Sequence, residues 1–520
     1  MTMFMSSLVK KKLIVSAIGL GFASMSQAQV PSLGHLDNSE YRQCQLDFKV
    51  NTEWNGGYTG EIALTNLDSK PIHKIDVSFE GNFELDQVWN ATLNTIQKFE
   101  NGNRFNVLSQ AWNRDLMPGE TMTVGVEISS MNMDKPFNLL VNGQPCAERR
   151  AGGFFTSWAI YRDGEAAYDM DDIPVNDVNQ IIHAFAIVNQ KGLAEVGDVY
   201  ADLGYVYESS PLTGHLNQYQ KLKENNPDMS LVISVAEVDH AGINFSLAAS
   251  THAHRQAFAK SILSFIDQYG FNGVDIDWEF PSSKDDQLGF TALLKELRYQ
   301  LDEKGLQDGE YYTLSADLPI AAYQMEYIDL AQFHQYVDQV NIMTYLYHGT
   351  WFPFTFHNAP LLPNYQVGIE EPLATQLSVQ WSIEQYVNAG VPRHKLNLGI
   401  PLFGSSWRNV PDLNNGLAQH NNTIQADSVI SYRDALTLHK NEGYYLGWDD
   451  ISKNSYLYHP TKKDGHFIQF DDIRTVKEKL EWAKEQGLGG AFAWEMTFDD
   501  LHQDSILPVM AESLKAESKR

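Results

Sequence analysis

Cysteine is scarce in this chain of 520 residues, which contains only Cys44 and Cys146. Two cysteines without nearby histidines at ligand spacing disfavour a zinc site, and we expect neither a metal nor a cofactor. In an oxidising compartment the two most simply pair with each other. Such a disulfide would stabilise the fold by about 4 to 5 kcal/mol in the chain-entropy treatment.

Positive charge is also in short supply. The chain carries 38 Lys and Arg against 66 Asp and Glu, a formal net charge of -28. No basic cluster interleaved with aromatic residues is present, so nucleic acid is a poor partner. The surplus carboxylates favour solubility instead.

Several catalytic signatures are missing. The 16 histidines show no His-Glu-x-x-His spacing, which disfavours zinc hydrolysis. The chain has neither a Walker-type phosphate loop nor a Gly-x-Ser-x-Gly elbow. The paired acids are predicted to be solvated or to cap helices: Asp449-Asp450, Asp471-Asp472 and Asp499-Asp500.

Long apolar runs are limited to the start of the chain. Three lysines, Lys10 to Lys12, precede an apolar run from Leu13 to Met25, which ends at Ser26-Gln27-Ala28. These are the three parts of a cleaved secretory signal, and the run is too short to span a bilayer. We therefore expect residues 1–28 to be removed near Ala28, giving a secreted protein that is not anchored in a membrane.

The most informative stretch that is present runs from Phe271 to Pro281. In an extended chain Asp275, Asp277 and Glu279 share one face and step about 6.7 Å apart. Carboxyl groups this close persist where protons are shared or pKa values are separated, which is the condition for acid catalysis. A solvated edge strand or an oxygen-rich metal site would be the alternatives. The neighbouring Trp278 favours a buried strand, and no Asp-x-Asp-x-Asp-Gly calcium loop is present.

Beyond this stretch, the chain divides into two regions with different patterns, and the second of them contains the three acids. Between the cysteines, short alternating segments separated by Asn, Gly, Asp and Pro predict an antiparallel β-sandwich over residues 40–148. Trp54, Trp89 and Trp112 each stand beside turn-forming or polar residues, which indicates exposed rings that could stack on sugars. Core packing is the competing interpretation.

Eight apolar runs follow, alternating with helical patterns, and predict a (β/α)₈ barrel over residues 152–515. The run after the seventh strand predicts a small α+β insertion at about 404–466. Glu279 would fall at a C-terminal strand end, where such barrels place their chemistry. The eight runs are Phe154 to Tyr161, Ile181 to Val188, Leu231 to Val235, Gly273 to Glu279, Tyr312 to Asp317, Val337 to Tyr345, Leu396 to Pro401 and Gly490 to Trp494.

Two family resemblances cover these regions. The spacing of Cys44, the three tryptophans and Cys146 resembles family 2 carbohydrate-binding modules, in which three surface tryptophans form a platform for crystalline cellulose or chitin. The barrel motifs resemble glycoside hydrolase family 18 chitinases over roughly Gly152 to Pro508. These motifs are Asp275-Ile-Asp277-Trp-Glu279, Gly153-Phe-Phe-Thr-Ser-Trp158, Met343-Thr-Tyr345, His357-Asn-Ala-Pro360 and Ala493-Trp494-Glu495.

The second resemblance implies substrate-assisted catalysis, in which the acetamido oxygen of the sugar attacks the anomeric carbon and the configuration is retained. Glu279 would be the general acid and base, and Asp277 would hold the acetamido N-H. Asp275 would adjust the proton on Asp277, and Tyr345 would bond the acetamido oxygen. Five side chains would bind the sugars: Trp494, which would floor the pocket, Met343, Phe185, Trp158 and Trp407.

The chain also departs from the family pattern. Asn272 replaces the first acid of the strand-four signature, and Leu346 stands where many relatives carry Asp. Glu237 on strand three would place bulk and charge near the cleft. Phe403 and Ser405 replace the Tyr and Arg of some relatives on strand seven. We expect these changes to alter subsite preference, and Ile75, which replaces a buried tryptophan of many sandwich modules, to affect packing.

Together these observations predict a secreted, monomeric, endo-acting chitinase that binds chitooligosaccharides in the barrel and an insoluble polysaccharide through the sandwich. An endo-β-N-acetylglucosaminidase acting on glycoprotein glycans uses the same acetamido chemistry. A non-hydrolytic or weakly active chitin-binding lectin is the alternative from another class, which Leu346 favours and Glu279 disfavours.

Overall fold

A computed structural model of the chain describes residues 44–66, 71–99, 102–131, 133–142, 144–146, 149–162, 168–227, 229–237, 242–308, 310–352, 354–365, 368–420 and 423–514. The predicted secretory signal lies outside the described residues.

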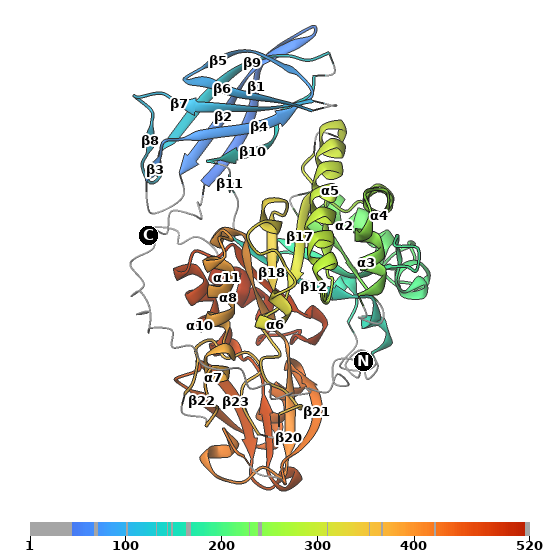
Figure 1. Ribbon diagram of the computed structural model, residues 1–520, viewed down its shortest axis with the longest axis vertical. Helices are drawn as coiled ribbons and strands as arrows, with labels where there is room; N and C mark the ends of the chain where they lie inside the picture. Colours follow the sequence, from blue (N-terminus) through green and yellow to red (C-terminus); the bar gives the residue numbers. More distant parts are fainter. Residues whose placement is uncertain are drawn as a thin grey trace.

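The N-terminal region is a sandwich of two antiparallel sheets (Figure 1). One sheet has the order β1-β2-β9-β5 and the other β11-β10-β4-β7-β6, with a short β3-β8 pair. Buried and half-exposed residues alternate along β2, which is the pattern of a strand with one face on the core. The strands are β1 (Cys44–Trp54), β2 (Gly57–Asn66), β3 (Ile72–His73), β4 (Asp76–Gly81), β5 (Glu84–Trp89), β6 (Ala91–Phe99), β7 (Gly102–Ser109), β8 (Asp115–Leu116), β9 (Thr121–Ser129), β10 (Phe137–Val141) and β11 (Gln144–Pro145).

The predicted disulfide is confirmed. Cys44 at the start of β1 is bonded to Cys146, 102 residues further along the chain, with their Cα atoms 4.8 Å apart. The bond therefore ties the first strand of the sandwich to its end. Ile75 is fully buried in the core of the sandwich, consistent with a packing role.

The second region is a closed barrel of eight parallel strands. Neighbouring strands follow the order β12-β25-β19-β18-β17-β16-β15-β13, and β12 also pairs with β13, which closes the barrel. Each of the eight predicted runs overlaps one barrel strand, so the predicted fold class is confirmed. The strands are β12 (Arg150–Thr156), β13 (Gln180–Val188), β15 (Ser230–Ala236), β16 (Gly273–Ile276), β17 (Thr313–Leu318), β18 (Gln339–Ile342), β19 (Leu396–Pro401) and β25 (Gly490–Trp494); β14 (Ala194–Val196) adds antiparallel to β13.

Helices connect and cover these strands. Their ends carry the expected capping groups: α4 starts where the Thr251 side chain accepts a hydrogen bond from the His254 N–H, and it stops at Gly270, whose φ is 76°. The α-helices outside the insertion are α2 (His215–Asn225), α3 (Ile243–Ser250), α4 (His252–Tyr269), α5 (Lys284–Asp308), α6 (Ala322–Met325), α7 (Leu373–Gln376), α8 (Val379–Asn388), α10 (Ile473–Glu485) and α11 (Ile506–Leu514). The shorter helices are η1 (Ser157–Tyr161), η3 (Met170–Asp172), η4 (Tyr200–Gly204), η5 (Phe333–Gln335), η6 (Arg393–Lys395), η7 (Asn414–Gly416), η8 (Lys462–Asp464) and η9 (Met496–Phe498).

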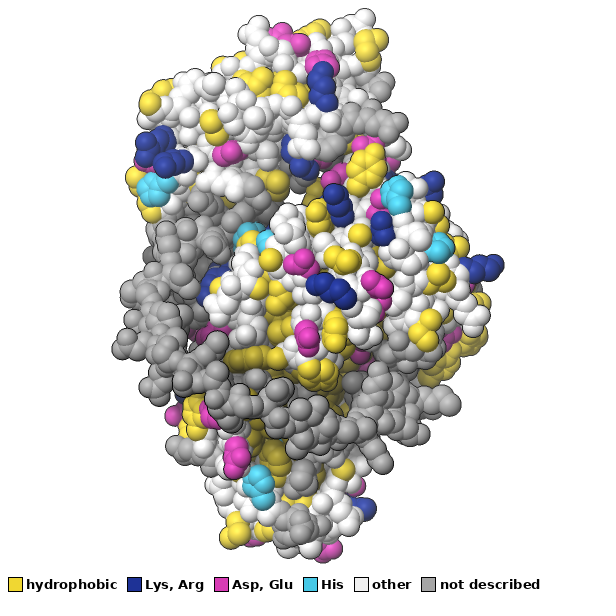
Figure 2. Space-filling model, in the orientation of Figure 1, with side chains coloured by type: hydrophobic (Ala, Val, Ile, Leu, Met, Phe, Trp, Pro, Cys, Tyr) yellow, Lys and Arg dark blue, Asp and Glu magenta, His cyan; other side chains and the backbone are white. Residues whose placement is uncertain are grey.

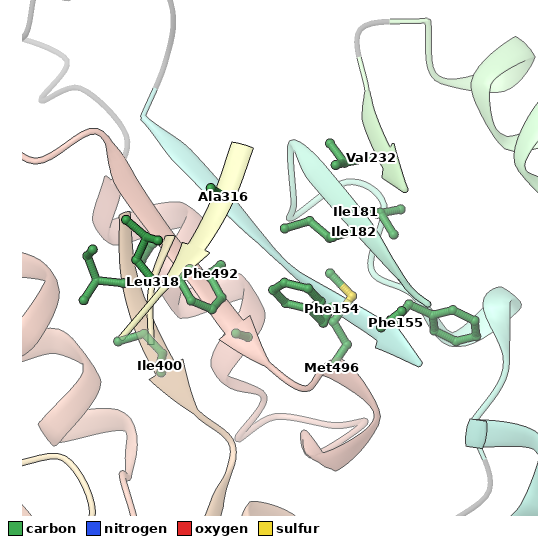
Figure 3. Packing of buried hydrophobic residues seen from close by; sticks show 14 of the residues in the cluster. Phe154, Phe155, Ile181, Ile182, Val232, Ala316, Leu318, Ile400, Phe492 and Met496 are labelled. Atoms are coloured by element: carbon green, nitrogen blue, oxygen red, sulfur yellow. The ribbon is translucent and has the colours of Figure 1, made fainter. Parts of the chain in front are cut away.

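Apolar side chains fill part of the barrel interior, between its first and last strands. Phe154 of the first strand packs edge-on against Phe492 of the last, with ring centroids 5.6 Å apart (Figure 3). Ile400 and Met496 lie around the same core. The first strand, β12, and the last, β25, are thus joined by packing as well as by their backbone pairing.

A small α+β unit is inserted between β19 and β25, as predicted. Its described residues form a five-stranded antiparallel sheet of order β21-β20-β24-β23-β22 and one α-helix, α9 (Tyr432–Glu442). Its own aromatic core includes Trp407, Tyr456 and Phe467. The strands are β20 (Phe403–Arg408), β21 (Gln425–Ser431), β22 (Tyr445–Asp449), β23 (Asn454–His459) and β24 (His466–Gln469).

The sandwich sits at the N-terminal end of the barrel, and the insertion sits at the other end (Figure 1). A cavity of about 400 Å³ lies between sandwich and barrel, lined by Arg104 on one side and by Tyr311, Asp338 and Lys395 on the other. The last three directly precede β17, β18 and β19. The sandwich is therefore remote from the C-terminal strand ends.

The surface agrees with the acidic composition. On the face shown in Figure 2, the Lys and Arg side chains of the described residues are scattered rather than gathered in one patch. Among the described residues, no helix is both long enough and apolar enough to cross a lipid bilayer.

Candidate active site

The acidic row lies at the C-terminal end of strand four. Strand β16 ends at Ile276, so Asp275 lies within the strand, while Asp277 and Glu279 continue beyond its end. Asp275 and Asp277 are buried and Glu279 is partly exposed. The row therefore runs from the barrel interior to its mouth.

Asp275 is held by donors from three other strands of the barrel. Its Oδ2 accepts a hydrogen bond from Ser234 Oγ at 2.7 Å, and its Oδ1 accepts one from Ser315 Oγ at 2.6 Å. Asn341 Nδ2 donates to the same Oδ1 at 3.3 Å. Burial raises the pKa of Asp275 to about 6, against the lowering effect of these hydrogen bonds.

Asp277 has a different environment. Its Oδ1 is buried and has no hydrogen-bond partner among the described residues. Burial, then the charges of Glu279 and Asp275, raise its pKa well above the ordinary value. Both charged neighbours are acids, so they add to the effect of burial in opposing the ionisation of Asp277.

Tyr345 joins this group from strand six. It lies just beyond the end of β18 and is buried, with its ring packed against Phe403 at 5.7 Å between centroids. Burial raises the pKa of Tyr345 well above its ordinary value, and the charges of Asp317, Asp277, Glu279 and Asp275 raise it further. The structure thus brings the four predicted catalytic residues together.

A fourth carboxyl group, Asp317 of β17, belongs to the same cluster and was missed in the sequence. It is 3% exposed, and its pKa is raised well above the ordinary value by burial and by the charges of Asp275 and Asp277. A signal was present: Thr313, Ser315 and Asp317 alternate with apolar residues, as the acids of strand four do.

Aromatic side chains surround the mouth beside the acids. Trp494, at the end of β25, is partly exposed; its ring stacks on Phe185 at 6.0 Å and lies 6.4 Å from Trp158. Trp158 and Met343 are also partly exposed, whereas Phe185 is buried. Phe185 therefore supports the Trp494 ring from behind.

The loops that carry these residues are fastened by polar contacts. The Asn358 side chain accepts a hydrogen bond from the Leu346 N–H at 2.9 Å and donates one to the Phe403 carbonyl at 3.1 Å. Arg162 pairs with the buried Glu495 at 2.6 Å. The Asn358 contacts join the segments that follow β18 and β19. The Arg162 contact joins the segments that follow β12 and β25.

The three tryptophans of the sandwich are exposed by 42% (Trp54), 38% (Trp89) and 69% (Trp112). A Cβ on Gly125 would overlap the Trp89 ring, and one on Gly57 would lie 2.9 Å from Trp54 Nε1. Both rings therefore lie close over glycines of the β1-β2-β9-β5 sheet.

The third ring is held near Trp89. Trp112 Nε1 donates to Gln110 Oε1 at 2.8 Å, and Asn113 Nδ2 donates to the carbonyl of Asn90 at 2.7 Å. The loop that carries Trp112 is therefore bonded to the residue that follows Trp89.

Comparison with known proteins gives two family matches. Residues 150–499, more than half of the chain, match the profile described as glycosyl hydrolases family 18. The chain belongs to glycoside hydrolase family 18. Residues 44–146 match a second profile, described as a cellulose binding domain.

Individual relatives of this family-18 chain agree. It is 33% identical over 400 residues to chitinase A1 of Niallia circulans, covering 67% of this chain and 56% of that protein. It is 30% identical over 393 residues to chitinase 1 of Aphanocladium album, covering 72% of this chain and 89% of that protein. Among solved structures, the chitinase ChiA74 from Bacillus thuringiensis aligns with a TM-score of 0.65 at 26% identity, covering 72% of this chain and 71% of that one.

The structure corrects the expectation that Trp407 binds a sugar. Trp407 is 1% exposed and lies in the core of the insertion, with its ring 6.0 Å from Phe467 and 5.3 Å from His348. A ring enclosed in this way presents no face to a sugar. We therefore leave Trp407 out of the sugar-binding set.

Glu237, which directly follows β15, has a structural contact. It is 4% exposed, and its Oε1 accepts hydrogen bonds from the backbone N–H groups of Asn244 and Phe245, at the start of α3. Its charge stabilises the N-terminus of α3. Asn272 likewise has a structural contact, since its Oδ1 accepts from the Leu231 N–H at 2.7 Å.

Proposed function

We propose that this family-18 chain is a secreted, endo-acting chitinase that hydrolyses β-1,4 bonds between N-acetylglucosamine units. The gathering of Asp275, Asp277, Glu279 and Tyr345 at the barrel mouth carries this proposal. We propose residues 40–148 as its carbohydrate-binding module and residues 152–515 as its catalytic domain, with the insertion at about 404–466.

The first chemical step begins with Glu279, which is partly open to solvent. Glu279 donates its proton to the glycosidic oxygen while the bond from that oxygen to the anomeric carbon breaks. The acetamido oxygen of the sugar forms a new bond to the same carbon, giving a positive oxazolinium. Asp277 binds the acetamido N-H, and the Tyr345 hydroxyl bonds the acetamido oxygen, an alignment that can lower the barrier by several kcal/mol.

The second step restores the enzyme. Water attacks the anomeric carbon as the bond to the acetamido oxygen breaks, and Glu279 takes the proton of that water. Two successive displacements at one carbon give overall retention. Trp494 forms the floor beneath the reacting sugar, and Trp158 and Met343 bind beside it.

The proposal is tested by product analysis on three substrates: crystalline chitin, soluble chitooligosaccharides and a glycoprotein. We expect a series of chitooligosaccharides from the first two, with the β-configuration retained in the initial products. Release of intact N-glycans without chitin cleavage would instead establish an endo-β-N-acetylglucosaminidase. Tight chitin binding without turnover at acidic and neutral pH would establish a lectin.

A further inference from the structure

Asp317 occupies a defined place in the barrel interior. Ser315, two residues earlier on β17, points inward because its hydroxyl reaches Asp275. Side chains alternate along a strand, so Asp317 also points inward, one layer closer to the mouth. Asp275 is paired in register with Ser315, and continuing that register places Asp317 beside Asp277.

The hydrogen-bond donors around Asp275 leave one acceptor site of its carboxylate unoccupied. An ionised carboxylate offers about four lone-pair sites. Ser234, Ser315 and Asn341 occupy three of them. The Asn341 donor is fixed in this direction because its Oδ1 accepts from Asn397 Nδ2 at 2.9 Å.

We propose that Asp317 is a positioning residue of the catalytic set, which keeps its own proton and donates it in a fourth hydrogen bond to Asp275. Asp277 then finds no free acceptor at Asp275 and is directed to Glu279 and to the acetamido group. The proposal rests on the function proposed above.

The electrostatics of the cluster support this arrangement. A hydrogen bond from Asp317 is among the causes that lower the pKa of Asp275, which opposes the effect of burial. The buried Oδ1 of Asp317 has no hydrogen-bond partner among the described residues. An ionised carboxylate with an unpartnered buried oxygen is costly, so the neutral acid is the stable form.

Asp499 shows how a buried acid with only a structural role differs. Its carboxylate accepts hydrogen bonds from the backbone N–H groups of Ile506 and Leu507 and from Ser505 Oγ. Those donors hold the start of α11. Asp317 faces other acids, Asn341 and Tyr345 instead.

The first test uses kcat to separate the effect of the hydrogen bond donated by Asp317 from the effect of its carboxyl group as an acid. Asp317→Asn keeps an N–H donor toward Asp275, so we expect kcat on a soluble chitooligosaccharide to stay within about threefold of the wild type. Asp317→Leu removes the donor, so kcat should fall by at least about tenfold with KM little changed. Asp499→Asn is the control for a buried acid, with lower thermal stability and unchanged kcat. Equal losses of kcat in the Asn and Leu variants, or no loss in either, would overturn the proposal.

The second test needs no activity, so it remains decisive if the proposed function is wrong. A retained proton means that the folded protein binds one proton that the unfolded chain releases above the ordinary Asp pKa, near 3.9. Wild-type stability must then fall with rising pH relative to Asp317→Asn, which lacks this group. We expect the melting temperature of Asp317→Asn to gain on the wild type between pH 4 and pH 7. A change in the opposite direction, or none, would show that Asp317 is ionised and would overturn the proposal.

Discussion

At the scale of single residues, the site brings several acids close together. The charged groups that act on the pKa of Asp277 are Glu279 and Asp275, and burial adds to their effect. A positive oxazolinium would therefore enter a pocket already prepared for positive charge. This is the electrostatic reason why these acids suit the proposed reaction.

Tyr345 provides a prediction with an internal control. Tyr345→Phe keeps the ring packing against Phe403 and Phe492 but removes the hydroxyl near the acids. We expect kcat on soluble chitooligosaccharides to fall on the order of a hundredfold, because one aligned hydrogen bond to the reacting group is lost. The melting temperature should change little, which thermal unfolding would check.

The control is Tyr347→Phe, two residues further along the chain. Tyr347 is also buried, and its hydroxyl donates to Ser382 Oγ of α8 at 2.9 Å. This variant should lose about 1 kcal/mol of stability and retain full activity. Equal losses of kcat in the two variants would contradict the role given to the Tyr345 hydroxyl.

The residue pattern predicted part of this site and missed the rest for a physical reason. Asp275, Asp277 and Glu279 could be found because one strand carries them at a period of two. Asp317 is a lone acid on another strand, and only the register of β16 with β17 brings it to the others. Trp407 was misassigned because the sequence of β20 does not reveal which face is covered by the core of the insertion.

At the scale of elements, the sequence predicted the presence of each barrel strand better than the residue at which that strand ends. The predicted strand from Phe154 to Tyr161 stops at Thr156, and a 3₁₀ turn follows it. Apolar side chains continue past the last backbone pairing because the loops at the barrel mouth are packed as well. The paired acids show the same limit: Asp472 caps α10 as predicted, but Asp471 is buried against Lys479.

A substitution in the sandwich sheet should move the Trp89 ring without removing it. Gly125 on β9 leaves space for Trp89, which a side chain at that position would fill. Gly125→Ala should tilt Trp89 away from the sheet and weaken adhesion to insoluble chitin or cellulose by about tenfold, the worth of one aromatic contact. Pull-down depletion of the protein by the solid polymer measures this.

Thr123→Ala is the matched control, since Thr123 lies two residues away on the same face of β9 and is half exposed. It should adhere like the wild type. Unchanged adhesion in Gly125→Ala, with the fold intact by circular dichroism, would show that Trp89 does not need its observed position.

At the scale of the whole molecule, the proposed binding module and the proposed active site lie at opposite ends of the barrel. The sandwich meets the segments that precede β17, β18 and β19, whereas Glu279 and Tyr345 lie beyond the C-terminal ends of their strands. Such an arrangement suits an anchor that holds the enzyme on a surface. It does not suit a platform that continues directly into the cleft.

Replacing Trp54, Trp89 and Trp112 together by Ala tests this separation. We expect adhesion to insoluble polymer to be lost and degradation of crystalline chitin to slow. The kcat and KM for soluble chitooligosaccharides should equal those of the wild type, because the sandwich that carries the three rings lies at the end of the barrel opposite its mouth (Figure 1). A fall in soluble turnover would contradict the separation of the two functions.

The central claim is that Glu279 transfers the proton in hydrolysis of N-acetylglucosamine polymers. The direct measurement compares the rate of chitooligosaccharide release by the wild type and by Glu279→Gln, at equal concentration of folded protein. We expect clear release by the wild type and a loss of about a thousandfold in the variant, with substrate binding retained. Equal rates in the two proteins would contradict this claim.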